Sequence, residues 1–357
     1  MATTNIDFTR LPFSAQSDWG KCLVSFLQSI YDKSGSQSSY DHYKGILMDY
    51  LSSVNTTPDL ISREEIERYL CSPSRANGRE GPVKYGTKNN RLAAIRSLYR
   101  FSAEYAVLDE QGIPQPLLRR LAPSAGIRFV QREKPPHRSL SEEQLAAFFK
   151  AIQTVKPDGS PNVQGLKWRA FFLCAFWTAA RRAVLCGLRW GDIQQATIRE
   201  PGHAPRQGYL YHWNGSKGHS RHSDSAEMPA VCVEAIYTYM EASGRLATIQ
   251  PGQPIWTTDE GYIGQHGYDP DRQIHPMTAL HACKRYAKRA GIDPVAICCH
   301  SFRHASALHR YLCGQGIFEI KTALRHSSLD MTAIYLAELA GQADSLPSLM
   351  TSRFGNL

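Results

Sequence analysis

Several features that mark large classes of protein are missing from this chain of 357 residues. It has no apolar run of about eighteen residues, which argues against a membrane-spanning helix. The first residues, MATTNIDFTRLPF, lack the basic start and long apolar core of a secretion signal. The nine cysteines form no C-x-x-C pair, and only Cys298 and Cys299 are adjacent. Because a P-loop and an acidic metal cluster are missing too, we expect a reduced, cytoplasmic protein without a metal, a cofactor or membrane contact.

Positive charge is in excess and is unevenly distributed. The chain has 41 Lys and Arg residues against 32 Asp and Glu residues, which gives a net charge of +9 and a pI near 9.1. Between Lys84 and Arg138, eleven basic residues stand against four acidic ones. A localised basic stretch favours binding to a polyanion, most often DNA or RNA. A solvated basic surface without a partner is the alternative when the charge is considered alone.

Helical periodicity predicts a small all-α bundle of about four helices over residues 18–110. A short, polar and flexible segment precedes it at residues 1–17. Ser62 and Glu65 have the spacing of a capping box, which marks the start of one of these helices.

A long helix is expected from about residue 87 to residue 105. Its back is apolar, whereas Arg96 and Arg100, four residues apart, share its polar face. A helix of this kind suits the groove of a duplex. Residues 111–138 are rich in Pro, Arg and Lys without periodicity, and they predict an extended basic linker of the kind that a clamp around DNA needs. A plain tether is the alternative.

Residues 139–340 predict an α+β domain, mostly helical with a small antiparallel sheet. A capping box at Ser141 and Gln144 starts its first helix, and one continuous apolar helix is expected over residues 167–187. Lys217 lies in a polar turn between two strand-like segments, and the expected strands are 208–213, 226–231 and 255–258. Further helical patterns occupy 277–290, 301–314, 317–325 and 328–340, and a tail helix is expected within 341–357.

The stretch from His300 to Tyr335 carries the candidate chemistry. His300 and Arg303 are three residues apart, and His326 and Tyr335 follow after 23 and 9 further positions. A cluster of basic and imidazole groups that presents a tyrosine hydroxyl could bind a phosphate and attack it. Taken singly, each residue has an ordinary structural explanation, because helix tyrosines usually pack and H-x-x-R pairs recur by chance.

Together, the order and spacing of these residues resemble the tyrosine recombinases, the phage-integrase-type site-specific DNA recombinases. The segment TAARRAVLCGLRWGDI (178–193) resembles the box with the family's first catalytic arginine, here Arg181. HSFRH supplies the family's H-x-x-R, and LRHSSLDMTAIY resembles its box with the second histidine and the tyrosine. Lys217 lies where the family keeps a lysine, and the similarity covers roughly residues 18–340.

The resemblance implies a catalytic set of six residues: Arg181, Lys217, His300, Arg303, His326 and Tyr335. In this interpretation the two arginines clamp the non-bridging phosphate oxygens, and His326 adds one more hydrogen bond. Tyr335 attacks phosphorus with His300 as the candidate base, and Lys217 protonates the departing 5′ oxygen. The 3′-phosphotyrosyl bond conserves the energy of the broken bond, so the resemblance implies no ATP, metal or cofactor.

The chain departs from the family pattern at several places. Ala179 and Arg325 stand where the family has glycine, and Val184 stands where it usually has an acidic residue. An insertion expected at residues 197–207 lengthens the interval between the first arginine and the lysine. Lys284 is a poor substitute for that lysine, because it is expected on a helix.

The implied partner is double-stranded DNA with an inverted-repeat target site, bound by a tetramer. The residues expected to contact DNA are Lys84, Lys88, Arg91, Arg96, Arg100, Arg128, Arg132 and Lys134. The tail at 341–357 could dock on the next subunit or on its own domain. Since only about 17 residues precede the first helix, we expect a simple two-domain enzyme acting on nucleoid DNA. A type IB topoisomerase and a catalytically impaired DNA-binding relative are the alternatives, and Val184 favours the second.

Overall fold

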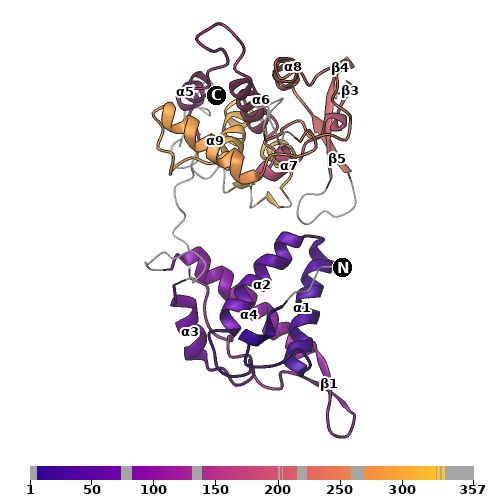
Figure 1. The fold of residues 1–357 in the computed structure, drawn as a ribbon, viewed down its shortest axis with the longest axis vertical. Helices are drawn as coiled ribbons and strands as arrows, with labels where there is room; N and C mark the ends of the chain where they lie inside the picture. The colour runs from indigo at the N-terminus through magenta and orange to yellow at the C-terminus, as the bar shows by residue number, and fades with distance from the viewer. Residues whose placement is uncertain are drawn as a thin grey trace, which may run out of the picture. The chain divides into compact units, whose positions relative to one another are not determined.

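The computed structural model describes residues 6–73, 83–130, 139–199, 202, 204–214, 223–258, 269–326, 328–329 and 332–333, with the backbone alone at 213–214 and 223–224. The chain divides into two compact units (Figure 1), and the described part of the first ends at Val130, whereas that of the second begins at Ser139. Both units are mostly helical with a small antiparallel sheet, which confirms the predicted fold class. Within the described ranges, no helix is long and apolar enough to cross a membrane.

Within the described residues, the first unit is a bundle of four helices, preceded by a short 3₁₀ turn. Its elements are η1 (Phe8–Arg10), α1 (Asp18–Ser34), α2 (Gln37–Leu51), α3 (Arg63–Cys71) and α4 (Tyr85–Glu104). The side chains of Ser17, Ser36 and Ser62 each accept a hydrogen bond from a backbone amide in the first turn of a helix. The predicted capping box of Ser62 and Glu65 is confirmed, with both reciprocal bonds present. The apolar faces meet in one core that includes Leu27, Leu47, Ile66 and Ile95.

Arg91 joins α3 to α4 from inside this unit. Its side chain is 3% exposed, and its Nη1 donates to the carbonyl oxygens of Tyr69 at 2.9 Å and Ser72 at 2.6 Å. The guanidinium also lies 4.6 Å from the ring centre of Tyr69 and 3.7 Å from the carboxylate of Asp49. Carbonyl groups at the end of α3 that lack helical partners are satisfied in this way. In this structure Arg91 therefore stabilises the unit from inside, and its contact with DNA stays a prediction.

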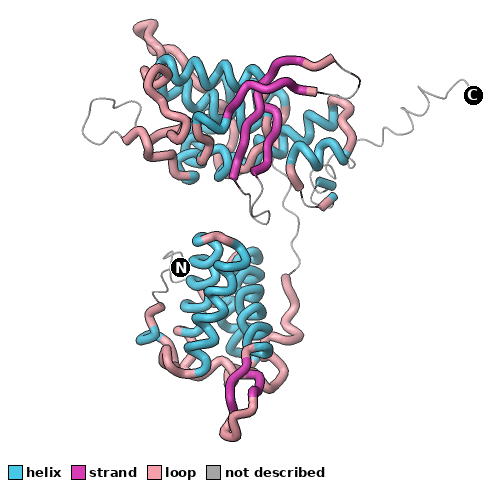
Figure 2. Tube along the Cα trace, turned by 90° about the vertical axis from the view of Figure 1, so that its right-hand side faces the viewer, coloured by secondary structure: helices cyan, strands magenta, loops and turns pink. Residues whose placement is uncertain are grey.

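A hairpin follows α4. β1 (Ala106–Leu108) pairs in antiparallel fashion with β2 (Pro114–Pro116), and Figure 2 shows the two short strands at one end of the bundle. The Asp109 carboxylate holds the turn by accepting the backbone amides of Gln111 at 3.1 Å and Ile113 at 2.8 Å. Asp side chains that bond to the backbone in this way favour a turn.

Beyond the hairpin, the chain packs onto the bundle instead of running as the extended linker that the sequence predicts. Leu118 and Ile127 are 4% and 5% exposed and belong to the core of the bundle. Asn89 of α4 exchanges two hydrogen bonds of 2.9 Å with the backbone of Val130. The apolar anchors outweigh the Pro-rich, basic composition that suggested a linker. Residues 131–138 lie outside the described ranges.

The second unit combines seven helices within the described ranges with a three-stranded sheet. The helices are α5 (Glu142–Lys150), α6 (Val163–Trp177), α7 (Arg182–Cys186), α8 (Ala230–Ala242), α9 (Pro276–Arg289), α10 (Cys299–Leu312) and α11 (Ile317–Leu324), with a 3₁₀ turn η2 (Trp190–Asp192). The sheet has the antiparallel order β3-β4-β5, and its strands are β3 (Ile193–Ile198), β4 (Arg206–Asn214) and β5 (Ser223–Glu227). Figure 2 shows these strands lying along the helices of the unit.

The sheet agrees with the sequence in its central hairpin and differs elsewhere. β4 and β5 form the predicted antiparallel pair, whereas β3 and α8 are not predicted. The two ends of the expected insertion at 197–207 pair with each other, Thr197 with Gln207 and Ile198 with Arg206. The expected strand at 255–258 contains a single isolated bridge, at Thr257.

Buried basic side chains support the segment that replaces this last strand. Lys167 is 1% exposed, and its Nζ donates to the carbonyl oxygen of Thr257 at 2.9 Å. Arg245 is 5% exposed, and its guanidinium donates to the carbonyl oxygens of Ile255 at 2.9 Å and Pro254 at 2.7 Å. Side chains therefore supply the hydrogen bonds that a neighbouring strand would otherwise provide.

Three phenylalanines form the centre of the second unit. Phe148 of α5, Phe172 of α6 and Phe302 of α10 are each 0% exposed. The ring centre of Phe302 lies 4.9 Å from that of Phe148 and 5.1 Å from that of Phe172. Such aromatic contacts add directional packing to the burial of apolar area. They fix how α10 is rotated about its own axis.

The predicted continuous helix over 167–187 is wrong, because the chain breaks between α6 and α7. Thr178 accepts the backbone amide of Ala180 at 3.2 Å and donates its hydroxyl to the carbonyl oxygen of Cys174 at 2.6 Å. Ala179 is 0% exposed and has a φ of 51°, in the left-handed region. The apolar pattern continues across the break because the turn is itself buried. For this reason, periodicity alone predicts one helix.

We expect Arg91→Met to destabilise the first unit by about 2–4 kcal/mol, because two buried carbonyl groups and Asp49 lose their partner. Urea unfolding followed by circular dichroism measures the change. Arg100→Met is the matched control, since Arg100 lies on the same helix with an exposed side chain. Its effect should stay within about 0.5 kcal/mol. Equal effects of the two substitutions would contradict the structural role of Arg91.

Candidate active site

α10 carries the predicted H-x-x-R pair in its first two turns. Phe302 points into the aromatic centre, which orients the residues on either side of it. Arg303 is directed inward and is 1% exposed, whereas His300 remains exposed at the start of the helix. The two residues therefore share one end of α10 but differ in their access to solvent.

Arg303 binds two separate turns of the backbone. Its Nη1 donates to the carbonyl oxygen of Ala179 at 2.5 Å, and its Nη2 donates to the carbonyl oxygen of Leu324. Ala179 has a left-handed backbone, and so has Arg325, the residue after Leu324, with a φ of 53°. The break after α6 and the end of α11 are thus held together by one guanidinium group.

Arg181 lies at this junction because the chain breaks there. It is the N-cap residue of α7, and its side chain is half-buried. Within the described residues, no hydrogen bond or ion pair ends on its guanidinium group. Val184, which replaces the family's acidic residue, packs against the apolar core of the unit. The backbone turn rather than a carboxylate therefore places Arg181.

The turn after α11 presents His326. Its backbone amide donates to the carbonyl oxygen of Lys321 at 3.1 Å, and its side chain is 6% exposed. The ring Nδ1 lies 2.9 Å from the hydroxyl oxygen of Thr332, which is 0% exposed. When Thr332 donates to Nδ1, the proton of the neutral ring is on Nε2, from which it can bind an anion.

Thr332 is a residue of the site that the sequence does not predict. It lies between His326 and Tyr335, the two predicted residues of one motif. The sequence shows a hydroxyl residue in that interval, but the spacing of Thr332 from His326 does not by itself indicate a contact with the imidazole. The contact depends on how the chain turns after α11.

Both imidazoles are held in their neutral form by their surroundings. Desolvation of the ring by the surrounding protein is the main cause that lowers the pKa of His300 to about 4, and the positive charges of Arg303 and Arg181 add to it. Burial, followed by the charges of Arg303, Arg181 and His300, lowers the pKa of His326 to about 4. Among the described residues, the positive charges of Arg303 and Arg181 act on both rings. The site is therefore arranged to receive an anion.

The other predicted catalytic residues, Lys217 and Tyr335, lie outside the described residues. The same holds for Arg132 and Lys134 of the DNA-binding set and for the tail at 341–357. The structure therefore brings together four of the six predicted catalytic residues, which are Arg181, His300, Arg303 and His326.

The other basic residues of the first unit that are expected to contact DNA differ in how exposed they are. Lys84, Arg100 and Arg128 are exposed, and Lys88 is half-buried with its Nζ 3.3 Å from the sulfur of Cys71. Arg96 donates to the carbonyl oxygen of Ile127 and lies 4.7 Å from the ring centre of Phe129. Arg96 therefore fixes the chain after the hairpin as well as adding charge.

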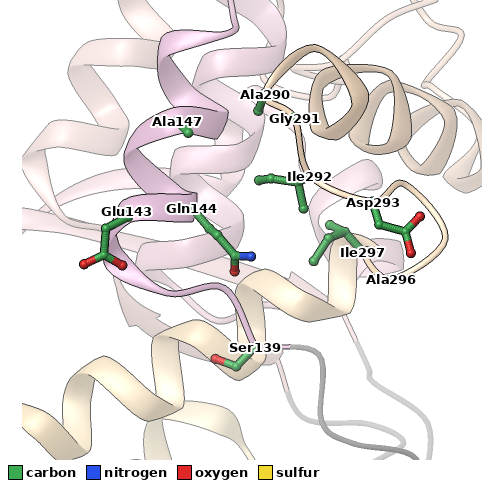
Figure 3. A pocket seen from close by; sticks show the side chains of 10 residues that line it. All are labelled: Ser139, Glu143, Gln144, Ala147, Ala290, Gly291, Ile292, Asp293, Ala296 and Ile297. Carbon is green, nitrogen blue, oxygen red and sulfur yellow. The ribbon is translucent and has the colours of Figure 1, made fainter.

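A pocket of about 450 Å³ lies elsewhere in the second unit, between α5 and the loop after α9 (Figure 3). Its lining includes Ser139, Gln144 and the acidic side chains of Glu143 and Asp293. Carboxylates repel phosphate, and none of the predicted catalytic residues lines this pocket. The candidate active site is therefore the positive cluster at the start of α10.

The comparison with protein families agrees with this cluster. Residues 138–341, more than half of the chain, match the family model described as "Phage integrase family". The chain therefore belongs to this family of tyrosine recombinases. The order and spacing of its motifs predict the same family.

Individual relatives extend the comparison. The tyrosine recombinase XerD of Xanthomonas axonopodis pv. citri (strain 306) is 44% identical over 52 residues, which are 15% of this chain and 17% of that protein. The chain thus matches less than a fifth of this curated relative's length. The structure of the XerH site-specific recombinase bound to palindromic difH substrate, a post-cleavage complex, has a TM-score of 0.62 at 15% identity, over 95% of this chain and 92% of that one.

A second similar structure is that of the Tn1549 transposon integrase in complex with transposon right end DNA. It has a TM-score of 0.58 at 14% identity, over 94% of this chain and 99% of that one. At such identities the likeness concerns the fold. It extends over both units of the chain.

We expect acid to destabilise the second unit through His326. Its pKa of about 4 in the folded protein lies below the value of about 6.5 in an unfolded chain, so the unfolded chain takes up the proton first as the pH falls. The neutral ring makes its full contribution to the free energy of unfolding above about pH 6.5, and this contribution is lost as the pH falls from there to about 4. Between about pH 7 and 4.5 the loss should be about 2 kcal/mol.

Urea unfolding of the wild type and of His326→Gln at several pH values measures this contribution. The variant should lose less stability on acidification than the wild type. His281→Gln, at an exposed position on α9, is the control and should keep the wild-type dependence. Identical pH profiles for the wild type and His326→Gln would rule out the assigned titration.

Proposed function

We propose that this protein is a site-specific DNA recombinase that cuts and rejoins DNA strands through a 3′-phosphotyrosyl intermediate on Tyr335. One observation carries the proposal: two arginines and two neutral histidines meet at the start of α10, and the positive charges of both arginines act on both histidines. A scissile phosphate is the anion that such a site fits. Membership of the phage integrase family supports the same reaction.

The side chains have separate tasks in this reaction. Arg181, the more accessible of the two arginines, and Arg303 hold the non-bridging oxygens of the phosphate. His326 donates to the same oxygens from Nε2, with Thr332 fixing its tautomer. The field of the cluster stabilises the charge that these oxygens gain in the transition state.

The proton and bond changes balance without an added cofactor. The Tyr335 oxygen forms a bond to phosphorus while the bond to the 5′ oxygen breaks. His300 accepts the tyrosine proton, which its neutral ring allows, and a bound phosphate raises its pKa from the low value of the free site. Lys217 gives a proton to the departing 5′ oxygen. Reversal of these steps with a new 5′ hydroxyl joins the strands.

The DNA partner follows from the first unit. Lys84, Arg100 and Arg128 are exposed there and are available to phosphates. The similar structures of XerH and the Tn1549 integrase are described as complexes with DNA, the former with a palindromic substrate. We therefore infer a duplex with inverted repeats, bound by a tetramer on two duplexes at the nucleoid. The tail at 341–357 could dock on the next subunit of this assembly or on its own domain.

Covalent trapping tests the reaction. Nicked duplexes prepared from the DNA that flanks the gene are incubated with the protein, and adducts are detected after denaturation. We expect the wild type to form a 3′ adduct and Tyr335→Phe to form none. Arg303→Lys should form the adduct at least about a thousandfold more slowly, since lysine lacks the paired donors of arginine. Tyr311→Phe is the matched control, because Tyr311 is 47% exposed on α10, and it should keep the wild-type rate.

The same experiment distinguishes the alternatives. DNA binding without an adduct under any condition would indicate a catalytically impaired relative, which Val184 in place of an acidic neighbour of Arg181 would explain. Relaxation of supercoiled plasmid without sequence preference would indicate a type IB topoisomerase. Val184→Glu should leave the rate unchanged or raise it, because an acidic neighbour would orient Arg181.

Salt dependence tests the DNA-binding surface. For binding to a duplex of fixed length, Lys84→Gln, Arg100→Gln and Arg128→Gln should each reduce the slope of log K against log salt by about 1, since each removes about one phosphate contact. Lys33→Gln, an exposed lysine of α1 outside the predicted set, is the control and should leave the slope unchanged. Slopes that remain at the wild-type value in all three variants would remove these residues from the interface.

A further inference from the structure

Arg325 occupies a backbone conformation that normally favours glycine. It follows α11 as the C-cap residue with a φ of 53°, at the position where the family pattern has glycine. A residue with a Cβ is strained in this region, and helix ends of this kind most often carry glycine. Arginine at this position therefore calls for an interaction that glycine cannot make.

The Arg325 side chain makes that interaction with β4. Its Nη2 donates to the hydroxyl oxygen of Tyr211, and its guanidinium lies 5.1 Å from the centre of the Tyr211 ring. Tyr211 is 0% exposed, and its backbone pairs with Ile193 of β3 and Ala226 of β5. The arginine is therefore attached to a side chain that the sheet and the core hold rigidly.

Tyr211 also contacts the other turn of the active site. The side chain of Thr178, the residue before Ala179, lies close enough to the Tyr211 hydroxyl to act on its pKa. Burial raises the pKa of Tyr211, although Arg325 and Thr178 oppose the shift, so the phenol is neutral at pH 7. The contacts from Arg325 through Tyr211 to Thr178 thus join the same two turns that Arg303 joins, by different atoms.

We propose that Arg325 is a positioning residue for strand cleavage, which holds the turn of His326 against β4 through Tyr211. This rests on the proposed function, because the positioned group is the imidazole assigned to the scissile phosphate. β4 ends at Asn214, and Lys217 follows three residues later in the chain. Arg325 therefore links the histidine that binds the phosphate to the strand that leads to the assigned general acid.

Arg325→Gly separates positioning from stability, because glycine suits the left-handed backbone. We expect a urea midpoint equal to or above that of the wild type. Affinity for nicked duplexes from the DNA that flanks the gene should change by less than about twofold, while the single-turnover rate of adduct formation falls about tenfold or more. Arg325→Lys, which keeps the charge and one donor, should restore part of the rate.

Tyr211→Phe tests the other end of the contact, because it keeps the ring and removes only the hydroxyl. It should lower the rate by a smaller factor than Arg325→Gly. Combining the two substitutions should lower the rate no further than Arg325→Gly alone, because both remove one interaction. Independent, multiplied effects would show that the two residues act separately and would overturn the proposal.

A second measurement needs no DNA. In protein with isotope-labelled histidine, nuclear magnetic resonance should give a pKa near 4 for His326 in the wild type. In Arg325→Gly the pKa should move towards about 6.5, because the loosened ring gains solvent and leaves Arg303. Arg289→Gln is the matched control, since Arg289 also lies over a tyrosine ring, 5.5 Å from the centre of Tyr286, and it should change neither the rate nor the titration.

The outcomes keep the two proposals apart. If the wild type forms no adduct on any flanking DNA, the proposed function fails, while the titration of His326 still decides whether Arg325 positions the ring. If Arg325→Gly keeps both the wild-type rate and the wild-type titration, Arg325 is not a positioning residue.

Discussion

The hydrogen bonds of the Arg303 guanidinium to two backbone carbonyl groups are the constraint on which the second unit's site depends. They join the break after α6, which places Arg181, to the end of α11, which places His326. Both carbonyl groups lie at left-handed turns, where the backbone changes direction and its oxygens become available. The aromatic centre around Phe302 in turn fixes the rotation of α10. Packing of apolar rings therefore determines where the positive charges of the site lie.

The electrostatics of the site follow from the same arrangement. A buried guanidinium beside imidazoles makes protonation of those imidazoles unfavourable, so two groups that could be cations remain neutral. Neutral rings can accept or donate one proton, which general acid–base chemistry requires near neutral pH. An incoming anion would relieve the mutual repulsion of the charges already present. The site is accordingly less favourable when empty than when an anion occupies it.

A feature of the fold or of the site can be predicted from the sequence when the residues that form it are close together in the chain. The capping boxes at Ser62 and Ser141 are visible in the sequence because their partners lie three residues away. The predicted catalytic positions form a pattern of order and spacing that the sequence itself shows. The break at Ala179 is not visible, because the turn is buried and its apolar pattern is that of a helix. The buried contacts of Arg91 and of the chain up to Val130 are not visible either, because composition suggests solvent, whereas partners distant in sequence hold both inside the unit.

The two bonds of Arg303 also differ greatly in the length of chain that they close, and this difference has a consequence for folding. The bond to Leu324 spans 21 residues, whereas the bond to Ala179 spans 124. Loop-closure entropy grows with length, and contacts between distant segments form slowly. The α10–α11 pair can therefore form first as a local hairpin of helices, in which Arg303 already donates to the carbonyl oxygen of Leu324. The complete cluster arises only when the α6–α7 turn reaches it, so the chain acquires the positive charge arrangement of the candidate site late in folding.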